Sequence, residues 1–193
     1  MEIREIREMY QITEFCHHFL QMHIEEGDSC IDATAGNGYD TEFLCSLVGE
    51  NGTVYAFDIQ EEALLHTKER LDGAGYGDRA VLFHTGHERM QEYVKEEVGA
   101  VVFNFGYLPG GDHKIATKAE TSIEAIRQGM HFLRIGGVMS LCIYSGGDTG
   151  FEERERILAF LKELDPKKWL VVASEYYNRK NHPPMPVLVI RMK

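Results

Sequence analysis

The sequence lacks any run of about 20 apolar residues, so it predicts no membrane-spanning helix. Its first residues, Met-Glu-Ile-Arg-Glu, are charged and give no apolar segment of the kind found in secretory signals. The four cysteines form no C-x-x-C pair typical of zinc and redox sites, so buried free thiols are favoured. We therefore expect a cytoplasmic protein without a metal site.

Basic residues are also few. Lys and Arg number 20 against 31 Asp and Glu, which gives a formal net charge of −11. A molecule of that charge repels polyanions, so binding of nucleic acid through its overall field is disfavoured. A local basic rim remains compatible with this charge, because a phosphate responds to charges within about 8 Å at physiological salt. The proportions of 44% hydrophobic and 26% charged residues are those of an ordinary globular protein.

Short apolar segments alternate with helix-like segments along the chain. Apolar residues spaced three and four apart predict an N-terminal helix over residues 9–24. The strand-like segments that follow are residues 29–33, 53–57, 80–83, 100–103 and 137–143. The helix-like segments after them begin near residue 43 and then cover residues 61–71, 90–97, 118–133 and 152–164. This alternation predicts a mostly parallel sheet with helices on both faces.

The C-terminal part follows a different pattern. Residues 169–177 and 187–191 are strand-like with no helix between them, which predicts an antiparallel hairpin. Five β-α units and this hairpin make a Rossmann-like α/β fold with a seven-stranded sheet. No internal repeat or linker is visible, so we expect a single domain over residues 1–193, with residues 1–27 as an N-terminal helical extension.

Ligands of open parallel sheets bind beyond the carboxyl ends of the strands. The loop after the first strand reads D-A-T-A-G-N-G-Y-D-T over residues 32–41, where glycine allows a sharp turn close to a ligand. The dinucleotide fingerprint G-x-G-x-x-G fails here, because Thr41 replaces its third glycine. The acidic groups of the loop would repel a phosphate but suit an ammonium group. The predicted cofactor residues of this loop are Asp32, Gly36, Asn37, Gly38, Asp40 and Thr41.

S-adenosylmethionine fits such a loop, since it carries an ammonium group, a carboxylate and a sulfonium but no phosphate. Asp58 ends the second predicted strand, where a carboxylate can accept both ribose hydroxyls, and Gln60 can add a contact. Thr85 and His87 follow the third strand, where such folds contact the adenine. The plainer alternatives are a tight turn followed by a helix cap at residues 40–41, and a structural histidine.

The loop after the fourth strand, N-F-G-Y-L-P-G-G-D over residues 104–112, would face the transferred methyl group. Asn104 can accept a hydrogen bond from an incoming amine, and Asp112 or His113 can take the proton directly or through water. These three are the predicted catalytic residues. The alternative is a long loop that only folds over the cofactor.

Residues 32–41, together with residues 104–112 and 118–122, resemble the bacterial family long labelled rRNA methylases, whose members are understood as tRNA methyltransferases. The resemblance covers nearly the whole chain. It implies a class I methyltransferase that uses S-adenosylmethionine to methylate the amine of 5-aminomethyl-2-thiouridine at the tRNA wobble position. One segment departs from the family, in which Gly-His-Pro often follows the fifth strand, because residues 145–148 here read Ser-Gly-Gly-Asp.

An RNA substrate needs positive charge near the mouth of the site, and tyrosines there can stack on an anticodon base. Basic residues gather after the fourth strand and at the tip of the C-terminal hairpin. The predicted substrate-binding residues are Tyr107, Lys114, Lys118, Tyr144, Arg179 and Lys180. We expect the tRNA anticodon region as the partner, and a homodimer remains open.

Several alternatives share the same cofactor residues. The acceptor could instead be ribosomal RNA or a small metabolite, which the residues do not distinguish from tRNA. A catalytically silent module that binds a nucleotide or RNA is a second alternative, and Asn104 and Asp112 weigh against it. An NAD-dependent dehydrogenase is disfavoured by Thr41 in place of glycine.

Overall fold

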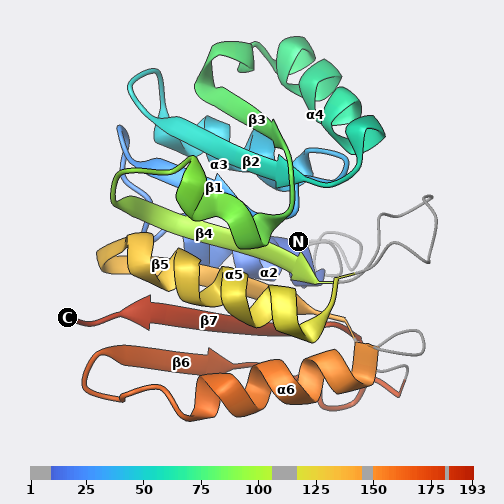
Figure 1. Ribbon diagram of the computed structural model, residues 1–193, viewed down its shortest axis with the longest axis vertical. Coiled ribbons are helices and arrows are strands. Elements are labelled where there is room, and N and C mark those ends of the chain that lie inside the picture. The colour runs from blue at the N-terminus through green and yellow to red at the C-terminus, as the bar shows by residue number, and fades with distance from the viewer. Residues whose placement is uncertain (1–9, 106–116, 145–149, 181–182) are drawn as a thin grey trace, which may run out of the picture.

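The computed structural model describes residues 10–105, 117–144, 150–180 and 183–193. Within these ranges the strands form one seven-stranded sheet in the order β3-β2-β1-β4-β5-β7-β6 (Figure 1). The strands are β1 (Ser29–Asp32), β2 (Thr53–Asp58), β3 (Ala80–His84), β4 (Val98–Phe105), β5 (Leu133–Ile143), β6 (Trp169–Ala173) and β7 (Met185–Arg191). The predicted Rossmann-like sheet of seven strands is confirmed.

The directions of the strands determine where a ligand can bind. β1 to β5 are parallel to one another, and β7 is antiparallel to both β5 and β6. The predicted C-terminal hairpin is confirmed, with Trp169 opposite Arg191. The strand order reverses between β1 and β4, and open α/β sheets bind their ligands at this point, beyond the carboxyl ends of the strands. We call this end of the sheet the carboxyl edge.

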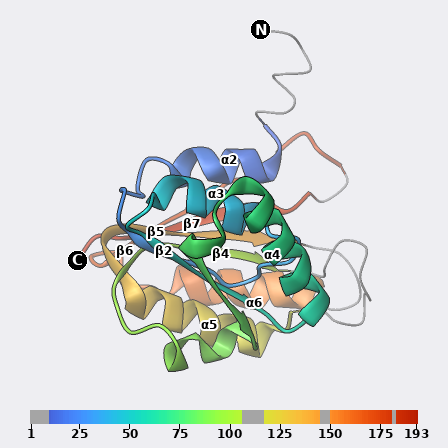
Figure 2. The same cartoon turned by 90° about the horizontal axis from the view of Figure 1, so that it is seen from above.

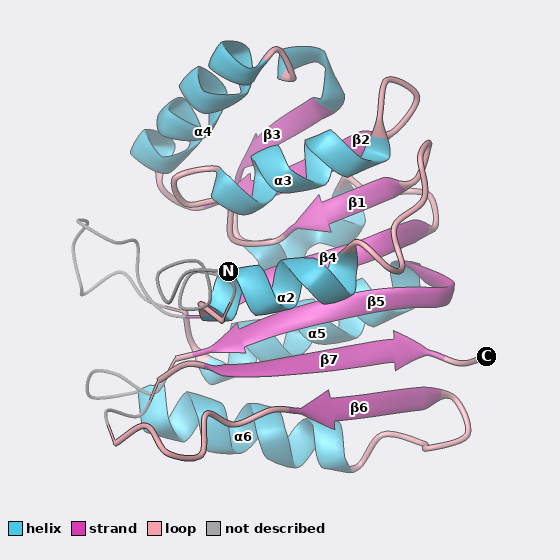
Figure 3. Ribbon diagram, turned by 180° about the vertical axis from the view of Figure 1, so that it is seen from behind, coloured by secondary structure: helices cyan, strands magenta, loops and turns pink. Residues whose placement is uncertain are grey.

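Helices cover both faces of the sheet, as the alternating pattern predicts. α2 (Ile12–Leu20), α3 (Tyr39–Val48) and α4 (Glu61–Ala74) lie on one face (Figure 2, Figure 3). α5 (Ala119–Phe132) and α6 (Gly150–Lys162) lie on the other face. α3 and α4 follow β1 and β2 after short loops, so their first turns lie at the carboxyl edge. No helix in the described ranges is long and apolar enough to cross a membrane.

Two helices differ from the sequence prediction, one in its length and one in its type. The helix predicted over residues 9–24 is α2, which ends at Leu20 because the next amides turn back onto its last carbonyl groups. The helix predicted over residues 90–97 is instead a 3-10 helix, η2 (His87–Glu92). β4 already begins at the fully buried Val98, so the preceding residues must extend to reach the core and cannot continue a helix. A further short 3-10 helix, η1, precedes β3.

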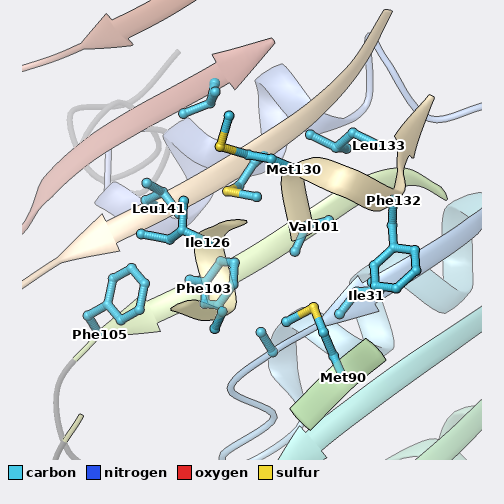
Figure 4. Packing of buried hydrophobic residues seen from close by; sticks show 14 of the residues in the cluster. Ile31, Met90, Val101, Phe103, Phe105, Ile126, Met130, Phe132, Leu133 and Leu141 are labelled. Carbon is cyan, nitrogen blue, oxygen red and sulfur yellow. The ribbon is translucent and has the colours of Figure 1, made fainter. Parts of the chain in front are cut away.

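β4 forms the centre of the sheet and is almost wholly buried. Every residue of this strand is buried except Asn104, and the rings of Phe103 and Phe105 stack at a centroid distance of 5.0 Å. Ile126 of α5 belongs to the same cluster of buried side chains (Figure 4). Burying a large apolar side chain contributes roughly 1.5–3 kcal/mol. The strand that carries Asn104 is therefore held firmly in the core.

α2 packs into the core instead of resting on its surface. Leu20 is fully buried in a cluster with Leu44 of α3 and Val138 of β5, and Cys16 is buried nearby. All four cysteines are buried free thiols, as predicted. The single-domain organisation stays a prediction, and this packing supports it.

Candidate functional site

Polar residues at the ends of three neighbouring strands meet at the carboxyl edge. Asp32 ends β1, Asp58 ends β2, and Asn104 is the last residue but one of β4. β1 lies between β2 and β4, so these residues flank the point where the strand order reverses. The sequence predicts all three as site residues, and the order of the strands brings them together.

The loop after β1 turns in a way that requires glycine. Gly36 and Gly38 have φ angles of +53° and +79°, in the left-handed region that other residues rarely adopt. A Cβ atom at Gly38 would lie 2.8 Å from the Cα atom of Thr67 in α4, so the loop rests directly on that helix. The Thr67 hydroxyl donates a hydrogen bond to the Gly36 carbonyl at 3.1 Å, and Arg70 donates one to the Asn37 carbonyl at 2.8 Å.

The Asp58 carboxylate joins β2 to this loop. Its two oxygens accept hydrogen bonds from the Gly36 amide and from the Gln60 amide, both at 2.9 Å. An ionised carboxylate has about four acceptor positions, so it can take two further donors. The predicted role of Asp58 towards a pair of ribose hydroxyls is compatible with this geometry.

Asp32 and Thr41 are both fully buried and bind each other. The Thr41 hydroxyl donates to one Asp32 oxygen at 2.6 Å, and the Thr34 amide donates to the other at 3.1 Å. Burial, together with the negative charges of Asp40 and Asp58, raises the pKa of Asp32 to about 7. Neither Asp32 nor Thr41 has exposed side-chain surface in this structure, so these two side chains shape the loop from inside.

A second network joins α2, α3 and β4. The Asn104 side-chain amide donates a hydrogen bond to one oxygen of Asp40, and His17 Nε2 lies 2.5 Å from the other. The His17 ring stacks on Phe43 at a centroid distance of 3.7 Å. The Asn104 main-chain amide also donates to the Thr34 hydroxyl at 2.7 Å. Sequence reasoning missed His17, because a histidine in an ordinary amphipathic helix gives no sign of a partner in another element.

His87 is nearly buried and contacts the main chain of the loop after β1. It is 9% exposed, and its Nδ1 atom lies 3.3 Å from the Ala33 carbonyl oxygen. Burial lowers the pKa of His87, which favours the neutral imidazole. This environment favours the alternative of a structural histidine. Thr85 is partly exposed and its amide bonds to the Phe83 carbonyl, so it remains available for the predicted adenine contact.

The predicted substrate residues lie partly within the described ranges. Tyr107, Asp112, His113 and Lys114 fall outside them, as does the Ser-Gly-Gly-Asp segment. Lys118 is exposed immediately before α5, and Tyr144 is 41% exposed immediately after β5. Among the described residues, no group of three or more His, Cys, Asp or Glu side chains is arranged to hold a metal ion.

The topology places the tip of the hairpin at the carboxyl edge. β6 and β5 are each antiparallel to β7, so β6 ends where β5 ends. Met185, the first residue of β7, pairs with Ile143, the last residue of β5. Arg179 and Lys180 are exposed in the turn between β6 and β7. They therefore lie at the carboxyl edge, as Asn104 does.

Two solved structures that resemble this chain are described as a methylase and a methyltransferase. A putative rRNA methylase from Clostridium thermocellum is 46% identical with a TM-score of 0.92, covering 94% of this chain and 97% of its own. A putative methyltransferase from Streptococcus mutans in complex with SAH is 35% identical with a TM-score of 0.86, covering 94% of this chain and 98% of its own. The fold and the site at the carboxyl edge thus define an S-adenosylmethionine-dependent methyltransferase of class I.

The sequence also identifies the family within this class. The model of the family described as "Putative rRNA methylase" matches residues 54–190, and the chain belongs to this family. A chloroplastic tRNA (mnm(5)s(2)U34)-methyltransferase from Arabidopsis thaliana is 38% identical over 191 residues, which cover 94% of this chain and 69% of that protein. The resemblance that the two loop motifs carry is therefore confirmed.

Proposed function

We propose that this enzyme transfers a methyl group to the amine of 5-aminomethyl-2-thiouridine at the wobble position of tRNA. The similarity to the Arabidopsis tRNA (mnm(5)s(2)U34)-methyltransferase carries the proposal, since it extends over 94% of this chain. The exposed basic residues at the carboxyl edge support an RNA acceptor in place of a small metabolite.

The residues around the loop fit a cationic nucleoside. Asp32, Asp40 and Asp58 lie close enough for the charges of the last two to raise the pKa of the first. The negative charges of Asp40 and Asp58 repel a phosphate and attract an ammonium or sulfonium group. We propose that Asp58 binds the ribose hydroxyls, that Asp40 attracts the ammonium group, and that the turn at residues 36–38 approaches the amino acid part.

Further cofactor contacts follow from the same placement. Gln60 is partly exposed beside Asp58, and Thr85 follows the neighbouring strand β3, so we propose that they contact the ribose and the adenine. Asp32 and Thr41 act by holding the loop, since their side chains bond to each other. We propose that His87 supports the loop from behind through the Ala33 carbonyl.

S-adenosylmethionine supplies an electrophilic methyl group on a sulfonium when bound. On the acceptor side, the amine nitrogen forms a bond to the methyl carbon while the carbon–sulfur bond breaks and its electron pair stays on sulfur. We propose that Asn104 accepts a hydrogen bond from the amine and aligns its lone pair with the methyl group, which is catalysis by positioning. The predicted proton acceptors, Asp112 and His113, lie outside the described residues and stay predictions.

Methylation of defined acceptors by the purified enzyme tests the proposal. The acceptors are tRNA that carries 5-aminomethyl-2-thiouridine, the same tRNA transcribed without modifications, and ribosomal RNA, and mass spectrometry of nucleosides detects the product. We expect 5-methylaminomethyl-2-thiouridine in the first sample alone. Methyl groups in ribosomal RNA or in the unmodified transcript, with none on the aminomethyl nucleoside, would contradict the proposed acceptor.

A further inference from the structure

Three elements that are distant in the sequence meet at the Asp40 carboxylate. His17 comes from α2, Asp40 from the first turn of α3, and Asn104 from the end of β4. The side chains of His17 and Asp40 are 13% and 12% exposed, so their 2.5 Å contact is largely shielded from water. Both Asp40 oxygens are engaged, one by each partner.

The chemistry of the carboxylate determines how the Asn104 side chain is oriented. A carboxylate only accepts hydrogen bonds, so the NH₂ group of the Asn104 amide must face Asp40 and its carbonyl oxygen must point elsewhere. In an isolated asparagine, rotation about the terminal side-chain bond exchanges these two groups with little steric consequence, because they are similar in size. Asp40 therefore selects the one orientation in which the Asn104 carbonyl oxygen faces away from Asp40 and can accept a hydrogen bond from an amine N–H.

His17 in turn fixes Asp40. Its Nε2 atom must carry a proton to bond to the carboxylate, and its ring is held by the stacking on Phe43, which lies one turn after Asp40 on the same face of α3. The space between α2 and the ends of β4 and β5 is a cavity of about 10 Å³, which leaves room for about one water molecule and none for a substrate. His17 can thus act on the reaction through Asp40 but not by touching the acceptor.

We propose that His17 is a positioning residue for methyl transfer, which orients Asp40 and thereby presents the Asn104 carbonyl oxygen to the acceptor amine. The identity of that amine rests on the proposed function, whereas the chain of hydrogen bonds from His17 to Asn104 does not. Stability alone does not require the contact, because Leu20 and Cys16 already anchor α2 in the core.

Variants at position 17 separate the hydrogen-bond donor from the ring. His17→Phe keeps an aromatic ring to stack on Phe43 but removes the donor, whereas His17→Gln restores an N–H donor without the ring. His18→Phe is the matched control, since His18 is exposed on the same helix and contacts the Glu14 carbonyl. We expect kcat to fall about 10- to 100-fold in His17→Phe. We expect His17→Gln to recover to within about fivefold of the wild-type kcat.

NMR tests the hydrogen-bond chain independently of activity. In ¹⁵N-labelled protein, the side-chain amide signal of Asn104 is assigned by its loss in Asn104→Asp. We expect this signal to shift in His17→Phe and in Asp40→Asn, and to stay in place in His18→Phe. An unmoved Asn104 signal in His17→Phe would overturn the inference, as would an unchanged kcat or an equal loss of kcat in the Phe and Gln variants. A wild-type enzyme that leaves the aminomethyl nucleoside unmethylated would overturn the proposed function instead, and the NMR result would still decide this inference.

Discussion

At the scale of single residues, the buried Asp32 carboxyl group links the folding of the enzyme to pH. The folded state holds its proton up to about pH 7, whereas an unfolded chain releases it near pH 4. Between these values the folded state binds more protons, so rising pH lowers the free energy of unfolding. Asp32→Asn cannot ionise, and from pH 5 to pH 8 we expect its stability relative to the wild type to rise by on the order of 2 kcal/mol.

Urea unfolding at both pH values measures this difference. Asp78→Asn is the matched control, because it makes the same substitution at an exposed carboxyl group in η1. A difference for Asp32→Asn that is independent of pH would show that Asp32 is already ionised in the folded protein.

The Asp58 carboxylate gives a prediction for cofactor binding. Removing a charged acceptor for two hydroxyls costs about 1.5–3 kcal/mol, so Asp58→Ala should weaken binding of S-adenosylhomocysteine about 10- to 100-fold in calorimetry. The wild type should also lose affinity for the 2′-deoxy analogue, whereas Asp58→Ala should bind both ligands equally. If the variant still distinguishes the two ligands as strongly as the wild type, another residue binds the ribose.

The sequence predicts those site residues whose roles follow from their place at the end of a strand or in a tight turn. Asp58 and Asn104 meet because the strand order brings their strands together, and Gly36 and Gly38 adopt the φ angles that only glycine takes readily. Burial of Asp32 could not be predicted, because an acidic residue beside glycines is equally typical of an exposed ligand. The contact of His17 is a tertiary one, which no spacing within a helix encodes.

At the scale of elements, the packing of the loop after β1 against α4 can be tested with two glycine variants. Gly38→Ala places a Cβ atom 2.8 Å from the Thr67 backbone at a φ angle of +79°, and we expect a loss of about 1–3 kcal/mol. Gly73→Ala lies in α4 with no atom within 4 Å of its new Cβ, and we expect a gain of about 0.5–1 kcal/mol. Thermal unfolding should therefore shift in opposite directions, and a stabilised Gly38→Ala would contradict the close approach of the loop to α4.

Element boundaries show where sequence patterns stop being informative. All seven strands were predicted within a few residues, because a buried strand such as β4 is a continuous apolar segment. The segment before β4 was predicted as a helix from its apolar spacing, yet η2 is a 3-10 helix. The residues between η2 and β4 must be extended to reach the buried Val98. This constraint arises from the assembled sheet and not from the local helix propensity of the segment.

At the scale of the whole molecule, the proposed tRNA substrate would have to bind an enzyme with a net charge of −11 through a local surface. The antiparallel β7 is what makes such a surface available, since it brings the turn after β6 back to the carboxyl edge. Lys118 reaches the same edge from the start of α5. Charges at the opposite end of the strands lie a full strand length away. This distance exceeds the Debye length at physiological salt, so these charges are largely screened.

Two pairs of adjacent basic residues flank β6 and test this placement. Arg179 and Lys180 follow β6 at the carboxyl edge, whereas Lys167 and Lys168 precede it at the opposite edge, and all four are exposed. Replacing either pair with alanine lowers the net charge by the same two units, so an effect of the overall field would be equal for both. If the local surface binds tRNA, replacing Arg179 and Lys180 should raise KM for tRNA about tenfold and lower the slope of log KM against log salt concentration by about two. Replacing Lys167 and Lys168 should change KM less than about twofold. Equal increases of KM in the two double variants would mean that tRNA does not approach the carboxyl edge along the hairpin.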